Sequence, residues 1–232
     1  MIIESKLVET YLSKKKYNYG LVVSVFFLTA CIVTSLFYWN ESQQISSYLS
    51  ANPQNVFKDK EYWRLITTLF AHGGIEHLLS NSLMLFFLTY FVTSFYGYII
   101  SIPLSITMGA LVNLLVLLAF KQNTTLVGIS GVIYYLWGLW FVLYLFIDET
   151  ITFTRRLVKV FAIFFILLVP TSYSPTTSYL AHYIGFAVGV LTGLGVYPFF
   201  KGRLSVYKKW EYKISEELEE MKFEEEAERL PE

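Results

Sequence analysis

The chain has 232 residues, of which 55% are apolar, 19% aromatic and only 16% charged. This composition is too apolar for an ordinary soluble domain and predicts a polytopic membrane protein embedded in a lipid bilayer. The 18 basic and 18 acidic residues balance, so net charge gives no reason to expect a nucleic-acid partner. The single cysteine, Cys31, excludes an internal disulfide and a thiolate metal site.

Uncharged runs locate the expected membrane spans, since about 20 apolar residues are needed to cross the hydrocarbon as a helix. The runs cover residues 21–39, 78–120, 122–147 and 160–200. The second run is long enough for two helices, with a break near Gly97 or Pro103, and the last splits in the turn-forming stretch 170–178. The fifth helix is expected to begin near Ile151. The sequence therefore predicts an all-α membrane protein, a bundle of six transmembrane helices over residues 21–200.

The two ends of the chain are predicted to be accessories to this bundle. Residues 1–20 contain apolar side chains at helical spacing beside lysines, which indicates a helix lying on the membrane surface, although a solvated helix fits equally well. The members of this pattern are Ile3, Leu7, Val8, Tyr11 and Leu12. Residues 201–232 form a charged tail rich in glutamate, which we expect to be solvated.

The placement of the basic residues predicts the orientation. They concentrate before the first helix, between the fourth and fifth helices, and in the tail, whereas the opposite side carries only Lys58, Lys60, Arg64 and Lys121. By the positive-inside tendency we expect both termini to be cytoplasmic. We expect the protein to reside in the plasma membrane of the cell. The connection 40–76 is then an outer loop.

Two polar residues in late apolar runs are candidates for chemistry. Ser130 lies near the start of the expected fourth helix and His182 near the start of the sixth, so both are placed at a similar shallow depth on the outer side. A hydroxyl and an imidazole are costly to desolvate in hydrocarbon, which makes a functional role the default hypothesis. A serine nucleophile with a histidine base is the natural pairing. The alternatives are a serine bonded to its own helix and a histidine that joins two helices.

Further polar and small residues support such a site. Asn81 follows His77 by one turn on the same helix face. Ala181, Gly185, Gly189 and Gly193 recur every four residues, which permits close packing of the last helix. A zinc site is disfavoured, because the stretch 72–77 has one residue too many for an H-x-x-E-H motif. Residues 128–132 also lack the second glycine of a G-x-S-x-G elbow.

Taken together, these motifs resemble the rhomboid family of intramembrane serine proteases. The matching parts occur in the family's order over roughly residues 20–200, and all three histidines of the chain fall on family positions. The matching parts are Glu61-Tyr62-Trp63-Arg64, His72, His77, Asn81, Gly128-Ile129-Ser130-Gly131, and Ala181-His182 with Gly185 and Gly189.

The resemblance implies roles for these residues. Ser130 is expected to be the nucleophile and His182 the base, with the ring of Tyr134 stacked on His182 in place of a carboxylate. The side chains of His77 and Asn81, with the Ser130 N–H, are expected to form the oxyanion hole.

The remaining matching residues have supporting roles in this picture. Gly128 and Gly131 are expected to allow close approach of backbone and substrate, His72 to brace the loop, and Trp63 and Arg64 to anchor it. No metal or organic cofactor is implied. The expected partners are transmembrane protein substrates.

One departure from the family pattern concerns the second helix. Many bacterial rhomboids carry a glutamate twelve residues after the asparagine and a small residue nearer to it, where this chain has Thr93 and Thr89. We expect hydroxyl hydrogen bonds to replace that polar network.

A catalytically silent rhomboid-like protein that binds transmembrane helices is the alternative function. A small transporter is disfavoured, because the intramembrane polar groups cluster near one surface and the sequence shows no repeat.

Overall fold

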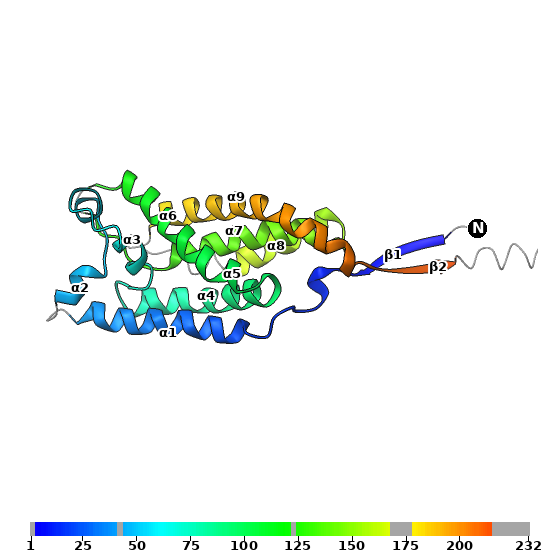
Figure 1. Ribbon diagram of the computed structural model, residues 1–232, viewed down its shortest axis with the longest axis horizontal. Coiled ribbons are helices and arrows are strands. Elements are labelled where there is room, and N and C mark those ends of the chain that lie inside the picture. Colours follow the sequence, from blue (N-terminus) through cyan, green and yellow to red (C-terminus); the bar gives the residue numbers. More distant parts are fainter. Residues whose placement is uncertain (1–2, 41–43, 122–123, 168–177, 215–232) are drawn as a thin grey trace, which may run out of the picture.

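The computed structural model describes residues 3–40, 44–121, 124–167 and 178–214. Its helices pack side by side into an elongated bundle, and a two-stranded ribbon projects from one end (Figure 1). The longer helices are α1 (Gly20–Trp39), α4 (Ile75–Tyr96), α6 (Pro103–Ala119), α7 (Ser130–Ile147), α8 (Phe153–Leu167) and α9 (Tyr179–Leu204). The short helices are α2 (Gln44–Tyr48), α3 (Arg64–Thr67) and α5 (Tyr98–Ser101), and the strands are β1 (Ile3–Glu9) and β2 (Lys209–Ile214).

The expected membrane helices are largely present. Within the described ranges, five stretches are long and apolar enough to span a membrane: Gly20–Trp39, Ile75–Tyr96, Tyr98–Ala119, Ser130–Ile147 and Tyr179–Gly202. The expected fifth span corresponds to α8, of which 15 residues are described. The rest of that span, with nearly all of the break expected at 170–178, lies outside the described residues. The prediction of an all-α membrane bundle is confirmed.

The break expected near Gly97 or Pro103 uses both residues. Helix α4 ends at Tyr96, and Gly97 follows with φ 93°, a left-handed conformation that favours glycine. The short α5 then leads to Pro103, the first residue of α6. Proline has no backbone N–H, and at this position of a helix an N–H would have no partner within the helix. One uncharged run therefore folds into two spans that turn back on each other.

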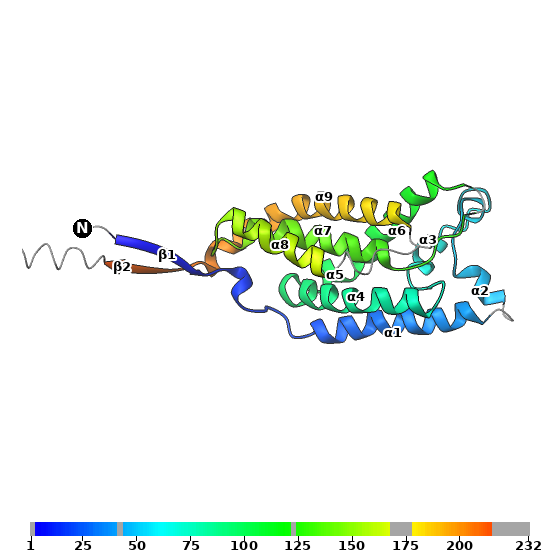
Figure 2. The same cartoon turned by 180° about the vertical axis from the view of Figure 1, so that it is seen from behind.

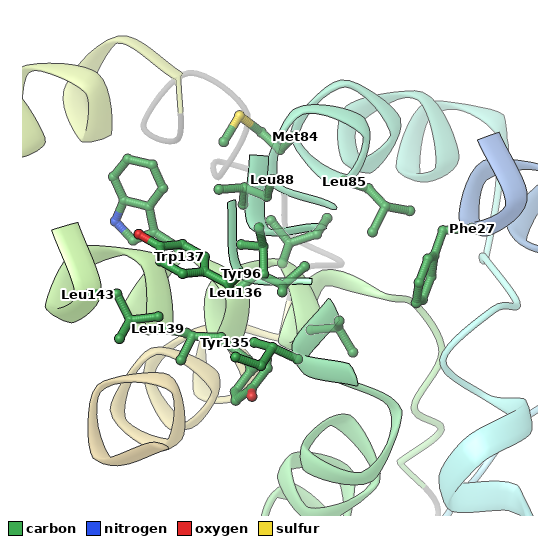
Figure 3. Close-up of a cluster of buried hydrophobic side chains, with 14 of the residues drawn as sticks. Phe27, Met84, Leu85, Leu88, Tyr96, Tyr135, Leu136, Trp137, Leu139 and Leu143 are labelled. Carbon is green, nitrogen blue, oxygen red and sulfur yellow. The ribbon is translucent and has the colours of Figure 1, made fainter. Parts of the chain in front are cut away.

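Helix α7 lies at the centre of the bundle. Its side chains Tyr135, Leu136, Leu139 and Leu143 are essentially fully buried. Figure 3 draws them in one buried cluster with a second group from the neighbouring helices. That group consists of Phe27 of α1 and Met84, Leu85, Leu88 and Tyr96 of α4. Seen from behind, α8 lies along α7 (Figure 2), and the rings of Phe141 and Phe161 meet edge to face between them. An apolar helix enclosed in this way is typical of a bundle core.

Glycines bring α7 and α9 into backbone contact. A Cβ atom placed on Gly189 would overlap the Tyr135 carbonyl oxygen, and one on Gly185 would overlap the Gly131 carbonyl oxygen. On α7, Gly138 has the same relation to the Phe186 carbonyl oxygen. The close packing predicted for the last helix is therefore observed. In lipid, where no hydrophobic effect drives helices together, such van der Waals contact holds them.

Hydroxyl groups join α1 to α4. The Thr89 hydroxyl donates to Ser24 Oγ at 2.9 Å, and Ser24 Oγ lies 3.0 Å from the Phe86 carbonyl oxygen. The hydroxyl bonds expected in place of the family's glutamate network therefore exist at Thr89. They do not form at Thr93, whose buried Oγ1 has no hydrogen-bond partner among the described residues.

The prediction of a helix over residues 1–20 was wrong, because Ile3–Glu9 forms strand β1, paired antiparallel with β2. Lys6 faces Glu211, and Lys209 Nζ lies 3.6 Å from Glu9 Oε1. A slip of two residues would place Lys6 opposite Lys209 or Lys213, and like charges facing each other are unfavourable, so charge selects the register. The apolar spacing was misleading because the partner strand lies at the far end of the chain.

The side chain of Tyr11 fastens the start of the chain to the bundle. Its hydroxyl donates to the Phe95 carbonyl oxygen at 2.6 Å, and its ring contacts the rings of Tyr96, Phe200 and Tyr207. Lys16 Nζ lies 4.0 Å from the centre of the Tyr207 ring, a cation–π contact. The ends of α4 and α9 are thus joined through the N-terminal segment.

We predict that Gly189→Ala lowers the thermal unfolding midpoint of the purified protein in detergent, because the new methyl group must push α7 and α9 apart. Overpacking of this kind costs about 1–3 kcal/mol. Gly195→Ala on the same helix is the matched control, since a Cβ there meets no atom within 4 Å. Equal midpoints for the two variants would contradict the packing described here.

Candidate active site

Ser130 is the first residue of α7 and follows a segment that is tied to the connection between α1 and α4. The Gly128 N–H donates to the Thr68 carbonyl oxygen at 3.0 Å, and Ala51 and Leu126 exchange two backbone hydrogen bonds. Ile129 is fully buried, while Ser130 is half-buried. The hydroxyl is therefore held at a fixed helix start near the end of the bundle that carries α2 and α3 (Figure 1).

His182 lies one turn into α9, at the same end of the bundle. Its side chain is buried, and its ring stacks on that of Tyr134 with centroids 4.0 Å apart and an interplanar angle of 13°. The Tyr179 ring meets it edge-on at 6.1 Å. The ring contact expected from the one-turn spacing of Ser130 and Tyr134 is thus present, and it fixes the plane of the imidazole.

The expected hydrogen bond between Ser130 and His182 is not formed in this structure. His182 Nε2 is buried and has no hydrogen-bond partner among the described residues. The two helices nevertheless touch beside this pair, because the Cβ position of Gly185 reaches the Gly131 carbonyl oxygen and that of Gly131 lies 3.8 Å from the Ala181 carbonyl oxygen. Catalytic hydrogen bonds are often long without substrate and tighten when it binds.

His77 and Asn81 both lie on α4. A Cβ atom placed on Gly128 would lie 2.7 Å from His77 Cε1 and 3.0 Å from His77 Nε2. The imidazole therefore packs directly on the Gly128 backbone. Gly128 has φ 116°, a backbone conformation that residues other than glycine rarely adopt. Asn81 is 9% exposed, and its Nδ2 has no hydrogen-bond partner within the described part of the chain. The His77 ring thus lies against the backbone two residues before Ser130, and Asn81 lies one turn after His77 on the same helix.

His72 lies in the loop just before α4 and is fully buried. Its ring meets the His77 ring edge to face, with centroids 5.1 Å apart. Burial, together with the neighbouring His77, lowers the pKa of His72 to about 4. The ring is therefore neutral at physiological pH.

Arg64 anchors the connection between α1 and α4. Its guanidinium is buried, lies 2.5 Å from Glu61 Oε2, and donates to the carbonyl oxygens of Ser47 and Ser50. Trp63 is half-exposed. The anchoring role expected of Arg64 fits these contacts. In the described ranges, no group of three or more His, Cys, Asp or Glu side chains is arranged to hold a metal ion.

Two residues of α1 that hold His72 in place were not predicted from the sequence. Ser35 Oγ lies 3.1 Å from His72 Nδ1, and Trp39 Nε1 donates to the His72 carbonyl oxygen at 2.7 Å. The available signal was a serine inside an apolar run, since polar groups in a membrane helix usually have a partner. Nothing in the local sequence indicated that His72 is that partner.

Comparison with known proteins identifies the family of the chain. A family profile described as "Rhomboid domain" matches residues 59–199, more than half of the chain. The "RHOMBOID-like protein 4" of Arabidopsis thaliana is 32% identical over 142 residues, which cover 60% of this chain and 35% of that protein. This chain therefore spans about a third of the length of the relative that it matches. On the strength of the profile match, the chain belongs to the rhomboid family.

Proposed function

We propose that the protein is an intramembrane serine endopeptidase that hydrolyses peptide bonds in or near transmembrane segments of other membrane proteins. One observation carries the proposal. The helix that starts with Ser130 is in backbone contact with the helix that carries His182, and the His182 ring is stacked on Tyr134, one turn from Ser130. A hydroxyl and an imidazole presented in this way are the two groups that a serine protease requires.

The reaction begins when Ser130 Oγ attacks the carbonyl carbon of the scissile peptide bond and its proton passes to His182 Nε2. The resulting tetrahedral intermediate carries a negative oxygen, which accepts hydrogen bonds from His77, Asn81 Nδ2 and the Ser130 N–H. The imidazolium is favoured by the electron-rich face of Tyr134. Asn81 Nδ2 and His182 Nε2 have their hydrogen-bonding capacity free for these steps within the described structure.

Collapse of the intermediate breaks the carbon–nitrogen bond as His182 returns the proton to the leaving amine. Water then attacks the acyl-serine, with His182 as base, and the second product leaves as a carboxylic acid while the Ser130 hydroxyl is restored. The proposed substrates are transmembrane proteins, which reach the site through the lipid bilayer. The proposed chemistry involves no cofactor.

We also place both termini in the cytoplasm and the protein in the plasma membrane. The ribbon of β1 and β2 lies at one end of the bundle, opposite α2 and α3 (Figure 1). Basic residues of the N-terminal segment and of the α9 end gather on the ribbon side, among them Lys14, Lys16, Lys201 and Lys208. This distribution follows the positive-inside tendency and supports an orientation with Ser130 on the outer side.

Replacing either member of the dyad tests the proposal. We expect Ser130→Ala and His182→Ala each to lower cleavage of a model single-span substrate by roughly 10³-fold or more, because the nucleophile or its base is lost. Cleavage is measured by gel electrophoresis with purified protein in liposomes. Ser82→Ala is the control, because Ser82 is a membrane serine whose hydroxyl bonds to the Leu78 carbonyl oxygen.

Labelling with a fluorophosphonate separates an enzyme from a silent helix-binding protein. An active Ser130 reacts with the probe, and Ser130→Ala abolishes the label. Undiminished cleavage by either dyad variant, or a wild-type protein that neither cleaves nor labels, would contradict the proposed protease function. A silent protein that still binds transmembrane helices would then remain.

Gly128 provides a second prediction. We expect Gly128→Ala to lower kcat by about 10²-fold, because the methyl group both strains the backbone and displaces the His77 ring. Gly74→Ala is the matched control, since its backbone is extended and a Cβ there meets no atom within 4 Å. Equal kcat values for the two variants would show that the Gly128–His77 contact does not matter for turnover.

A further inference from the structure

His72 is buried beside the site but is not among the groups that the proposed reaction uses. Its Nδ1 lies 3.1 Å from Ser35 Oγ and 3.2 Å from the Phe70 carbonyl oxygen. A carbonyl oxygen only accepts hydrogen bonds, so the contact with Phe70 requires the proton on Nδ1. Ser35 Oγ is 3.4 Å from the same carbonyl oxygen and donates to it. The imidazole, the hydroxyl and the carbonyl thus form one closed group.

Helix α1 holds the backbone of His72 as well as its ring. Trp39 follows Ser35 by one helical turn, and its indole Nε1 donates to the His72 carbonyl oxygen at 2.7 Å. His72 Nε2 has no hydrogen-bond partner among the described residues, so hydrogen bonds orient the ring only from its Nδ1 side. Both α1 residues lie before the region that matches the rhomboid profile, which begins at residue 59.

The ring held in this way touches the ring of His77. The two imidazoles meet edge to face, with centroids 5.1 Å apart and an interplanar angle of 74°. His77 in turn packs on Gly128, two residues before Ser130. A continuous line of contacts therefore runs from α1 through His72 and His77 to the backbone that presents the serine.

We propose that His72 is a positioning residue, locked to α1 by Ser35 and Trp39, that holds the His77 ring in the orientation needed for oxyanion binding. The inference rests on the proposed protease function and adds to it a role for α1. A neutral His72 suits this role, because burial and the neighbouring His77 lower its pKa to about 4 and no charge competes with the oxyanion. A misplaced donor near the reacting atoms is expected to reduce kcat more than substrate affinity.

The test compares α1 variants of the full-length protein in liposomes, with a single-span substrate whose cleavage releases a fluorophore. We expect Ser35→Ala to lower kcat about tenfold with KM little changed, and Ser35→Thr, which keeps the hydroxyl, to restore most of the loss. Trp39→Phe, which keeps an aromatic ring but removes the indole N–H, is expected to act in the same direction. Each variant is assayed below its own unfolding midpoint, so that loss of fold does not contribute.

Ser24→Ala is the matched control on the same helix. Ser24 is also a fully buried serine that bonds across to α4, but it contacts Phe86 and Thr89 rather than His72. We expect this variant to lower the unfolding midpoint as Ser35→Ala does, while its kcat stays at the wild-type value. A purely structural role for Ser35 would make the two variants behave alike in both measurements.

A double variant tests whether the effect passes through His77. In a His77→Ala background, Ser35→Ala is expected to cause no further loss in the rate at which a fluorophosphonate labels Ser130, because the ring that it positions is gone. The inference is overturned if Ser35→Ala loses no more kcat than Ser24→Ala, or if its effect persists in full without His77. A wild-type protein that neither cleaves nor labels would instead refute the protease function itself, and this inference with it.

Discussion

Backbone contact between α7 and α9 is the constraint on which the rest of the structure depends. Hydrocarbon offers no hydrophobic reward for joining two apolar helices, so their association relies on close van der Waals contact. Gly138, Gly185 and Gly189 remove the side chains that would prevent it. Because Ser130 and His182 lie at the starts of these two helices, the same contact that stabilises the bundle also sets the spacing between their side chains.

The polar groups at the site are held by contacts that differ from one group to the next. His182 is oriented by a stacked tyrosine, His77 by the Gly128 backbone and by His72, and His72 by α1. Aromatic and imidazole rings are suited to this because they are flat, rigid and able to fix each other's planes without a charged partner. An isolated carboxylate in the same place would be far more costly to desolvate. None of the ion pairs in the described part of the chain involves these three histidines.

Much of the bundle could be predicted from local patterns. Uncharged runs located the spans, Gly97 and Pro103 located a break, and the one-turn spacing of Ser130 and Tyr134 anticipated the ring contact with His182. The N-terminal strand could not be predicted in this way, because its apolar residues fit a helix until Glu211 and Lys209 are placed opposite Lys6 and Glu9. The hold of Ser35 and Trp39 on His72 was likewise hidden, since it joins a helix to a loop that follows much later in the chain.

By itself the sequence determined which stretches enter the membrane and which side chains are available for chemistry there. Those properties are local, because a helix satisfies its own backbone hydrogen bonds and needs only a sufficient apolar length. Only the tertiary structure decided several other contacts: His77 with Gly128 and His72, His72 with α1, and the first strand with the last. Such contacts depend on how helices approach one another, and that approach is determined by the shape of whole packed surfaces rather than by any short segment.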